Sequence, residues 1–205
     1  MNTKIVVDSS ASLYTLQGVD FECVPLKIIT DDAEYLDNGT MDALGMAQTL
    51  RTYKGKTSTS CPNVSDWLAA YEGADEVYAI TITGTLSGSY NAAQLAAEEY
   101  QQENPGKRVF VLDSLSTGGE MALAIWKAND LVASGLPFDE VVREWEIWFQ
   151  GRQVLFALAS FDNLVKNGRL SRLAGFMAGV MNMRAVGRGS EEGKLEMLHK
   201  TRGET

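Results

Sequence analysis

Two patterns of apolar residues alternate along the first 150 residues of the chain: short continuous runs and helical spacing. Short apolar runs predict buried strands at residues 4–7, 76–82 and 108–112. Residues 22–29 form another extended segment, in which Pro25 favours a place at a sheet edge. The remaining segments carry apolar residues at helical spacing and predict helices over 41–53, 62–71, 89–101, 118–134 and 138–149. This order of strands and helices predicts a parallel α/β sheet.

The pattern changes after Gly151. The later residues predict a strand over 154–159, a short helix over 161–165, and strands over 183–186 and 194–199 joined by a turn. We therefore expect an α/β domain over residues 1–150 with a parallel sheet. The start of a smaller, incomplete α+β domain is expected over residues 151–205. The unpaired edge of its sheet would allow a homodimer.

Charge and composition exclude several classes of partner. The chain has 205 residues and a formal net charge of −9, which opposes binding to nucleic-acid phosphates. No window approaches the ~20 apolar residues of a membrane span, so we expect no integral membrane segment. Cys23 and Cys61 are the two cysteines, and we expect no signal peptide, because the first residues lead directly into a predicted strand. Isolated thiols of this kind predict a cytoplasmic protein.

The single histidine, His199, limits the chemistry that the chain could perform. An enzyme of the hydrolase or phosphoryl-transfer type would use Ser87 with His199 as its base, yet no Gly-x-Ser-x-Gly elbow surrounds Ser87. One histidine and two distant cysteines match no metal-ligand spacing. We therefore expect a binding protein with no catalytic residue, metal or cofactor, and we keep the Ser87–His199 enzyme as the alternative.

Four hydroxyl-rich segments are predicted to form turns at one edge of the parallel sheet: residues 8–10, 57–60, 83–89 and 113–117. Ser, Thr and Asp at such places often serve only as helix caps. Four of them at one edge, however, would bring hydroxyl and backbone N–H groups together, as an anion requires. Ser87 is the strongest candidate, because Gly88 follows it and a helix is predicted to begin at Ser89.

Two features of the second half have both a structural and a functional interpretation. Arg169 could cap a helix or pair with a surface acid, and it could equally offer its guanidinium to a carboxylate. The run of small and flexible apolar residues over 173–181 could be core or could line a slot for a hydrocarbon chain. The residues alone leave both questions open.

Four motifs, in order and spacing, resemble the DegV family of bacterial fatty-acid-binding proteins. Asp8-Ser9-Ser10-Ala11-Ser12-Leu13 is similar to the family's opening Asp-Ser-x-x-x-Leu. Lys56-Thr57-Ser58-Thr59-Ser60-Cys61-Pro62 resembles its Lys-Thr-Ser-Gln-Pro-Ser segment, with Thr59-Ser60 in place of Gln-Pro. Thr83 to Tyr90 resembles Ser-Ser-Gly-Leu-Ser-Gly-Thr-Tyr, and Leu164 to Ser171 resembles Leu-x-Lys-Gly-Gly-Arg-Ile-Ser.

The resemblance implies a non-enzymatic carrier that buries one long-chain fatty acid between two domains. Carried over to this chain, the lipid carboxylate is held by Thr57 or Ser58 and by Ser87, with backbone approach at Gly88 and Arg169 as a neighbour. It also implies that a separate fatty acid kinase can phosphorylate the presented lipid. Family members continue beyond the position of Thr205, so we expect a chain that is shortened at its C-terminus.

Overall fold

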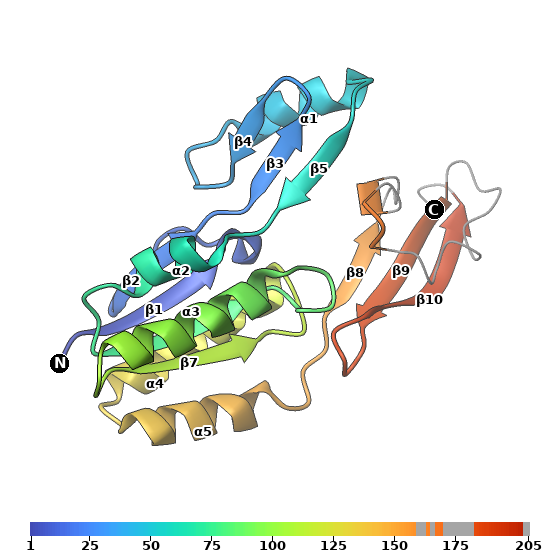
Figure 1. Ribbon diagram of the computed structural model, residues 1–205. Coiled ribbons are helices and arrows are strands. Elements are labelled where there is room, and N and C mark those ends of the chain that lie inside the picture. The colour runs from blue at the N-terminus through green and yellow to red at the C-terminus, as the bar shows by residue number, and fades with distance from the viewer. Residues whose placement is uncertain (159–162, 165–166, 170–182, 203–205) are drawn as a thin grey trace.

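The computed structural model describes residues 1–158, 163–164, 167–169 and 183–202. Its largest unit is a four-stranded, fully parallel sheet with the order β2-β1-β6-β7, here called sheet A. The strands are β1 (Thr3–Asp8), β2 (Asp20–Val24), β6 (Glu76–Thr81) and β7 (Arg108–Asp113), and a short 3-10 helix, η1 (Ser9–Ala11), follows β1. This sheet confirms the predicted α/β fold (Figure 1).

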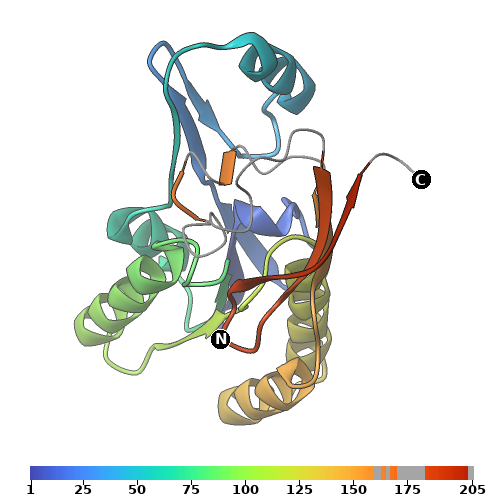
Figure 2. The ribbon, with the colours of Figure 1, turned by 90° about the vertical axis from the view of Figure 1, so that its right-hand side faces the viewer.

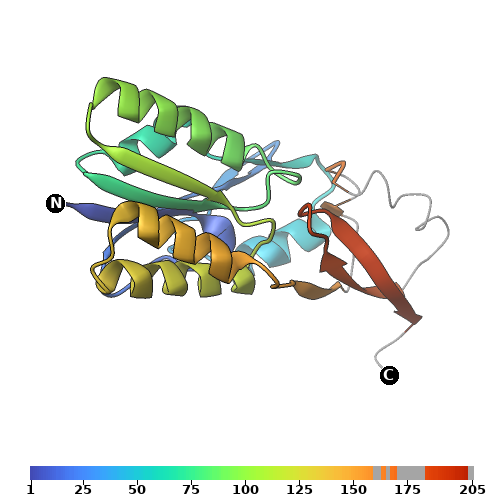
Figure 3. The same cartoon turned by 90° about the horizontal axis from the view of Figure 1, so that it is seen from below.

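Helices cover both faces of sheet A. Figure 3 shows α2 (Val64–Tyr71) and α3 (Ser89–Glu103) on one face, and α4 (Gly119–Ala133) and α5 (Phe138–Phe149) on the other. Local sequence explains where α2 begins: the Asn63 side chain accepts from the Asp66 N–H, and the Asp66 side chain accepts from the Asn63 N–H. This reciprocal capping box satisfies two N–H groups that the helix leaves unpaired.

Alternation along the strands divides the apolar residues between two cores. Ile5, Val7 and Ile80 pack with α4 and α5, whereas Val6 and Ala79 pack with α2 and α3. Successive side chains of a strand point to opposite faces, so a sheet covered on both sides reads as a continuous apolar run. This is why residues 4–7 and 76–82 show no polar alternation.

Residues 25–60 form a separate lobe. It contains an antiparallel sheet, sheet B, with the order β4-β3-β5, and the helix α1 (Ala43–Thr52). The strands are β3 (Lys27–Thr30), β4 (Glu34–Leu36) and β5 (Thr57–Ser60). Figures 1 and 2 show the lobe apart from the helices that cover sheet A. No residue between 25 and 60 is fully buried, so the lobe has no closed core of its own.

Three expectations for this region were wrong. The extended segment over 22–29 is two strands that belong to different sheets, because Pro25 lies between β2 and β3. The polar, turn-forming composition of residues 31–39 predicts a surface loop, yet this stretch contains β4. Residues 57–60, expected as a turn, form the edge strand β5, because their backbone pairs with β3 from Thr57↔Thr30 to Ser60↔Lys27.

The last described residues form an antiparallel sheet, sheet C, with the order β10-β9-β8. Its strands are β8 (Leu155–Leu158), β9 (Met183–Gly189) and β10 (Leu195–Arg202), close to the predicted ones. The apolar run over 173–181 and most of the helix predicted over 161–165 lie outside the described residues. Sheet C lies beyond the carboxyl ends of the sheet A strands (Figures 1 and 3). Within the described residues, no helix is both long and apolar enough to cross a membrane.

Candidate functional site

The loop between β6 and α3, residues 82–88, carries Ser87 and Gly88 and is held at both ends by one carboxylate. Asp8 Oδ2 accepts from the Ile82 N–H (2.9 Å) and from the Ser89 hydroxyl (2.6 Å). Asp8 lies at the end of β1 and is completely buried. Burial raises the pKa of the Asp8 carboxyl above its usual value, and the hydrogen bonds that it accepts act in the opposite direction. The loop is therefore fixed to the neighbouring strand.

Ser87 and Gly88 lead directly into α3. Ser87 Oγ accepts from the Ser89 N–H (3.2 Å), which leaves the hydroxyl proton of Ser87 for another acceptor. Gly88 is exposed and precedes the first residue of α3. A Cβ at Gly88 would lie 3.3 Å from Cys61 Sγ, so the chain following β5 comes close to this point. Helix N-termini of this kind favour anions.

Strand β5 approaches the same loop with its C-terminal end. Thr57 lies four residues before Cys61, which corresponds to about 13 Å along an extended strand. Thr59 is only two residues from Cys61 and is exposed. Because side chains alternate, Thr57 and Thr59 share one face of sheet B with Ile28, while Ser58 lies on the opposite face with Ile29. Thr57 and Ser58 therefore cannot act as equivalent ligands.

A cavity of about 500 Å³ lies between the lobe and the second half of the chain. Ile28, Met46 and Leu50 form its apolar part. Its polar lining comes from β5, including Thr57, Ser58 and Thr59, and from Asn163 and Asn167. Residues with hydroxyl groups and residues with apolar side chains thus line the same cavity.

Arg169 contacts the loop that carries Ser87. Its Nε donates to the Leu86 carbonyl oxygen at 3.0 Å, across 83 positions of sequence. The guanidinium therefore lies at the residue that precedes Ser87, as a neighbour of the candidate anion site. This contact, together with the approach of Cys61 to Gly88, brings three of the four motifs to one place.

The turn between β9 and β10 closes the other side of the loop. The carbonyl oxygen of Gly193 accepts from the hydroxyls of Thr83 (3.0 Å) and Thr85 (2.6 Å). Gly193 has a φ of 72°, and a Cβ there would collide with Thr83 Oγ1 and lie 3.0 Å from the Leu115 Cα. Only glycine fits this close approach. Thr83 and Thr85 therefore dock sheet C and are not free to bind a ligand.

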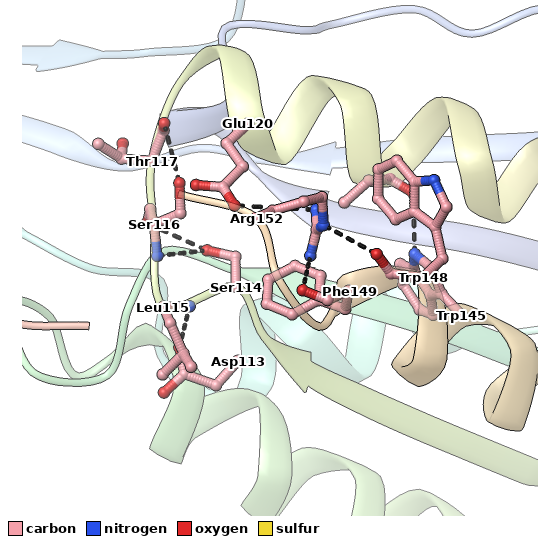
Figure 4. A network of polar contacts seen from close by, with 11 residues as sticks. Asp113, Ser114, Leu115, Ser116, Thr117, Glu120, Trp145, Trp148, Phe149 and Arg152 are labelled. Atoms are coloured by element: carbon pink, nitrogen blue, oxygen red, sulfur yellow. Dashed lines mark hydrogen bonds and ion pairs between the residues drawn. The ribbon is translucent and has the colours of Figure 1, made fainter. Parts of the chain in front are cut away.

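The fourth hydroxyl segment, residues 113–117, satisfies its own backbone. Ser114 Oγ donates to the Ser116 carbonyl (3.0 Å) and accepts from the Ser116 N–H (3.2 Å). The Asp113 carboxylate accepts from the Gly84 and Leu115 N–H groups, and burial raises its pKa. Figure 4 shows the Ser114 and Ser116 hydroxyls turned toward the backbone of the segment itself. This segment supports the neighbouring loop and offers little to a ligand.

Arg152 and Glu120 line a second cavity, of about 490 Å³, beside this fourth segment. The Arg152 guanidinium donates to the Trp148 and Phe149 carbonyls at the end of α5, and its Nη1 lies 3.8 Å from Glu120 Oε1 (Figure 4). Burial lowers the pKa of Arg152, and the charge of Glu120 opposes this. The pair anchors the chain between α5 and β8 to the helical layer.

The described residues offer little to the alternative enzyme. His199 is exposed on β10, where its backbone pairs with Val186 next to a β-bulge. No described contact joins His199 to Ser87, whose Oγ is bonded to the Ser89 N–H. In the same described ranges, no group of three His, Cys, Asp or Glu side chains could hold a metal ion.

Three residues of the site escaped the sequence reasoning: Asp8, Thr59 and Gly193. A signal existed for Thr59. Thr-Ser occurs twice in residues 57–60, and only in the second copy does the serine stand two residues before a proline, as it does in the Lys-Thr-Ser-Gln-Pro-Ser segment that this region resembles. Asp8 stands in the first hydroxyl-rich segment, where capping is the usual role of an aspartate. It does accept from the Ser10 N–H (3.2 Å), but its second oxygen reaches the distant loop. No sequence pattern reports such a contact.

A parallel sheet with hydroxyl-bearing loops at the carboxyl ends of its strands places the chain among α/β proteins that bind ligands at that edge. A family model described as "Uncharacterised protein, DegV family" matches residues 2–205. A DegV domain-containing protein of Streptococcus pneumoniae strain R6 is 43% identical over 207 residues, which cover 99% of this chain and 74% of the relative. The chain belongs to the DegV family.

Solved structures agree with the assignment. The Fatty Acid Kinase (Fak) B3 protein of Streptococcus pneumoniae, loaded with linoleic acid, is 43% identical and superposes with a TM-score of 0.94 over 99% of this chain and 74% of its own. A DegV family protein of Eubacterium eligens, loaded with heptadecanoic acid, is 36% identical, with a TM-score of 0.91 over 98% of this chain and 73% of its own.

Proposed function

We propose that this protein binds one long-chain fatty acid and carries it without chemical change. The observation that carries the proposal is the convergence of Ser87, Gly88, the end of β5 and Arg169 at the start of α3. Two relatives with the same fold and at least 36% identity were solved loaded with fatty acids. The ligand class therefore fits both the family and the local chemistry.

The carboxylate is proposed to lie against Ser87 and Gly88. The Ser87 hydroxyl donates to one carboxylate oxygen, because a carboxylate can only accept and the hydroxyl proton of Ser87 is not used in its bond with the Ser89 N–H. The N-terminus of α3 favours the negative charge. A hydroxyl of β5 supplies a further donor. Thr57 and Ser58 were the candidates from sequence, and position along the strand supports Thr59 in their place.

The acyl tail is proposed to lie between the lobe and the second half of the chain. The cavity beside β5 has an apolar lining of Ile28, Met46 and Leu50. These side chains lack a closed core, since no residue of the lobe is fully buried. Covering them with a hydrocarbon chain would contribute about 25 cal/mol per Å² of apolar surface removed from water. The division into residues 1–150 and 151–205 would place the lipid between two domains.

Carriage without catalysis is supported by the placement of the one histidine. His199 is exposed on β10, and Ser87 has the Ser89 backbone as its described partner. Presentation of the bound lipid to a fatty acid kinase is proposed on the likeness to the Fak B3 protein. In such a division of labour the carrier needs to expose the carboxylate and leave the phosphoryl transfer to its partner.

Fatty acid binding is tested by native mass spectrometry of the purified chain and by titration with oleic acid. We expect one lipid per chain, and Ser87→Ala should weaken binding about tenfold or more, because a hydrogen bond to a charged group contributes ~1.5–3 kcal/mol. If the parent protein takes up no fatty acid, the proposed function is wrong.

The β5 donor is tested by two identical changes on one strand face. Thr59→Val should weaken oleic acid binding about tenfold or more, because a hydrogen bond to a charged group contributes ~1.5–3 kcal/mol. Thr57→Val should leave the affinity within about twofold, because Thr57 is not expected to reach the carboxylate. The reverse order would return the carboxylate to Thr57 and contradict the assignment of Thr59.

A further inference from the structure

Asp8 has two carboxylate oxygens with separate tasks. Oδ1 accepts from the N–H (3.2 Å) and the hydroxyl (2.5 Å) of Ser10, within the turn that follows β1. Oδ2 accepts from the Ile82 N–H (2.9 Å) and the Ser89 hydroxyl (2.6 Å), 74 and 81 positions away. One oxygen therefore shapes the local turn, and the other binds the two ends of the loop that carries Ser87.

We propose that Asp8 is a positioning residue for fatty acid binding, which acts on the lipid carboxylate through Ser89 and Ser87. This inference rests on the proposed function. The Ser89 hydroxyl donates to Asp8 Oδ2, and the Ser89 N–H donates to Ser87 Oγ (3.2 Å). Two successive hydrogen bonds thus connect a fully buried carboxylate to the hydroxyl that meets the lipid.

The proposed effect of Asp8 on Ser87 depends on which group donates in each of these two hydrogen bonds. Asp8 as a carboxylate only accepts, so the Ser89 hydroxyl must donate to it and cannot turn toward Ser87. With its side chain fixed, Ser89 holds its N–H on Ser87 Oγ, and the Ser87 proton is directed away from the helix. Ser87 is then ready to donate before the lipid arrives, which avoids ordering it on binding.

The two serines whose hydroxyls donate to Asp8, one to each oxygen, provide a matched pair of substitutions. Ser89→Ala removes a partner of Oδ2, and Ser10→Ala removes a partner of Oδ1. We expect Ser89→Ala to weaken oleic acid binding about five- to tenfold and Ser10→Ala to change it less than about twofold. Only the Ser89 hydroxyl belongs to the series of hydrogen bonds that connects Asp8 with Ser87. Circular dichroism and urea unfolding check that both variants are folded.

A double-mutant cycle separates positioning from a general structural effect. Asp8→Ala should weaken binding about tenfold, yet Asp8→Ala combined with Ser87→Ala should bind no more weakly than Ser87→Ala alone, because Asp8 acts through Ser87. Losses that multiply in the double variant, or equal effects of Ser89→Ala and Ser10→Ala, would overturn the inference. If Asp8→Ala does not fold, Ser89→Ala in the same cycle with Ser87→Ala decides it.

Failure of the positioning role is distinguishable from failure of the proposed function. A parent chain that binds no oleic acid removes the function and the inference together. A parent chain that binds oleic acid, with Ser87→Ala weakened and Ser89→Ala unchanged, removes only the positioning role of Asp8.

Discussion

Gly193→Ala should detach the β9–β10 turn from the loop that carries Ser87. The added Cβ meets Thr83 Oγ1 on one side and the Leu115 Cα, at 3.0 Å, on the other. Thr83 could rotate away, but the Leu115 backbone could not, since its N–H is bonded to Asp113 (3.0 Å). The turn itself must therefore move, and the bonds from Thr83 and Thr85 to the Gly193 carbonyl are lost.

The magnitude follows from two contributions. Alanine in the left-handed region costs about 1–2 kcal/mol. Each lost hydrogen bond contributes about 0.5–1.5 kcal/mol, so the free energy of unfolding should fall by about 2–5 kcal/mol in all. Urea unfolding followed by circular dichroism measures it. Oleic acid binding should weaken as well, because the loop loses one of its supports.

Gly135→Ala is the matched control. Gly135 has a φ of 75°, against 72° for Gly193, and a Cβ there would meet nothing within 4 Å. It carries the same backbone strain without the collision, so it should lose only about 1–2 kcal/mol and bind oleic acid as the parent does. If the two variants lose equal stability, the docking of Gly193 against Thr83 and Leu115 contributes nothing and the reasoning fails.

Two further changes test the helix start and the buried carboxylate. Asn63→Ala should lower the free energy of unfolding by about 1 kcal/mol, because it removes the cap on the Asp66 N–H. Gln102→Ala, at an exposed position of α3, is the control, and equal losses would contradict a capping role. For Asp8→Asn the expectation concerns pH. The pKa of Asp8 is raised in the folded state above its ordinary value of 3.8, so its ionisation costs folding stability as pH rises above 3.8. The unfolding free energy of Asp8→Asn, relative to the parent, should therefore increase with pH over that window in urea titrations, and a difference that shrinks would show that the sign is wrong.

The parallel sheet could be predicted because its strands are buried on both faces. Runs such as residues 4–7 and 108–112 are short, apolar and followed by turn-forming residues, and each became a strand of sheet A. The lobe could not be predicted in the same way. Residues 57–60 are all hydroxyl-bearing and carry no alternation, so their strand state depends on pairing with β3.

Part of the candidate site could likewise be predicted from local sequence. Ser87, Gly88 and Arg169 stand in motifs that are read along the chain, and the structure brings Arg169 to the residue before Ser87. Asp8 and Gly193 act on partners 74 to 110 positions away. The role of Asp8 depends on the pairing of β1 with β6 within sheet A, and the role of Gly193 depends on how sheet C meets the loop that follows β6. No local pattern encodes either arrangement.

The lobe over residues 25–60 has no buried residue, so its side chains tolerate substitution more easily than those of the closed cores around sheet A. Substitutions in a closed core typically cost several kcal/mol, whereas those at half-exposed positions usually cost little. Residues such as Ile28, Met46 and Leu50 can therefore exchange for larger or smaller apolar side chains without endangering the fold. The Asp8–Ser89–Ser87 chain has no such freedom. Related proteins could thus acquire a preference for a different acyl chain length while keeping one way of holding the carboxylate.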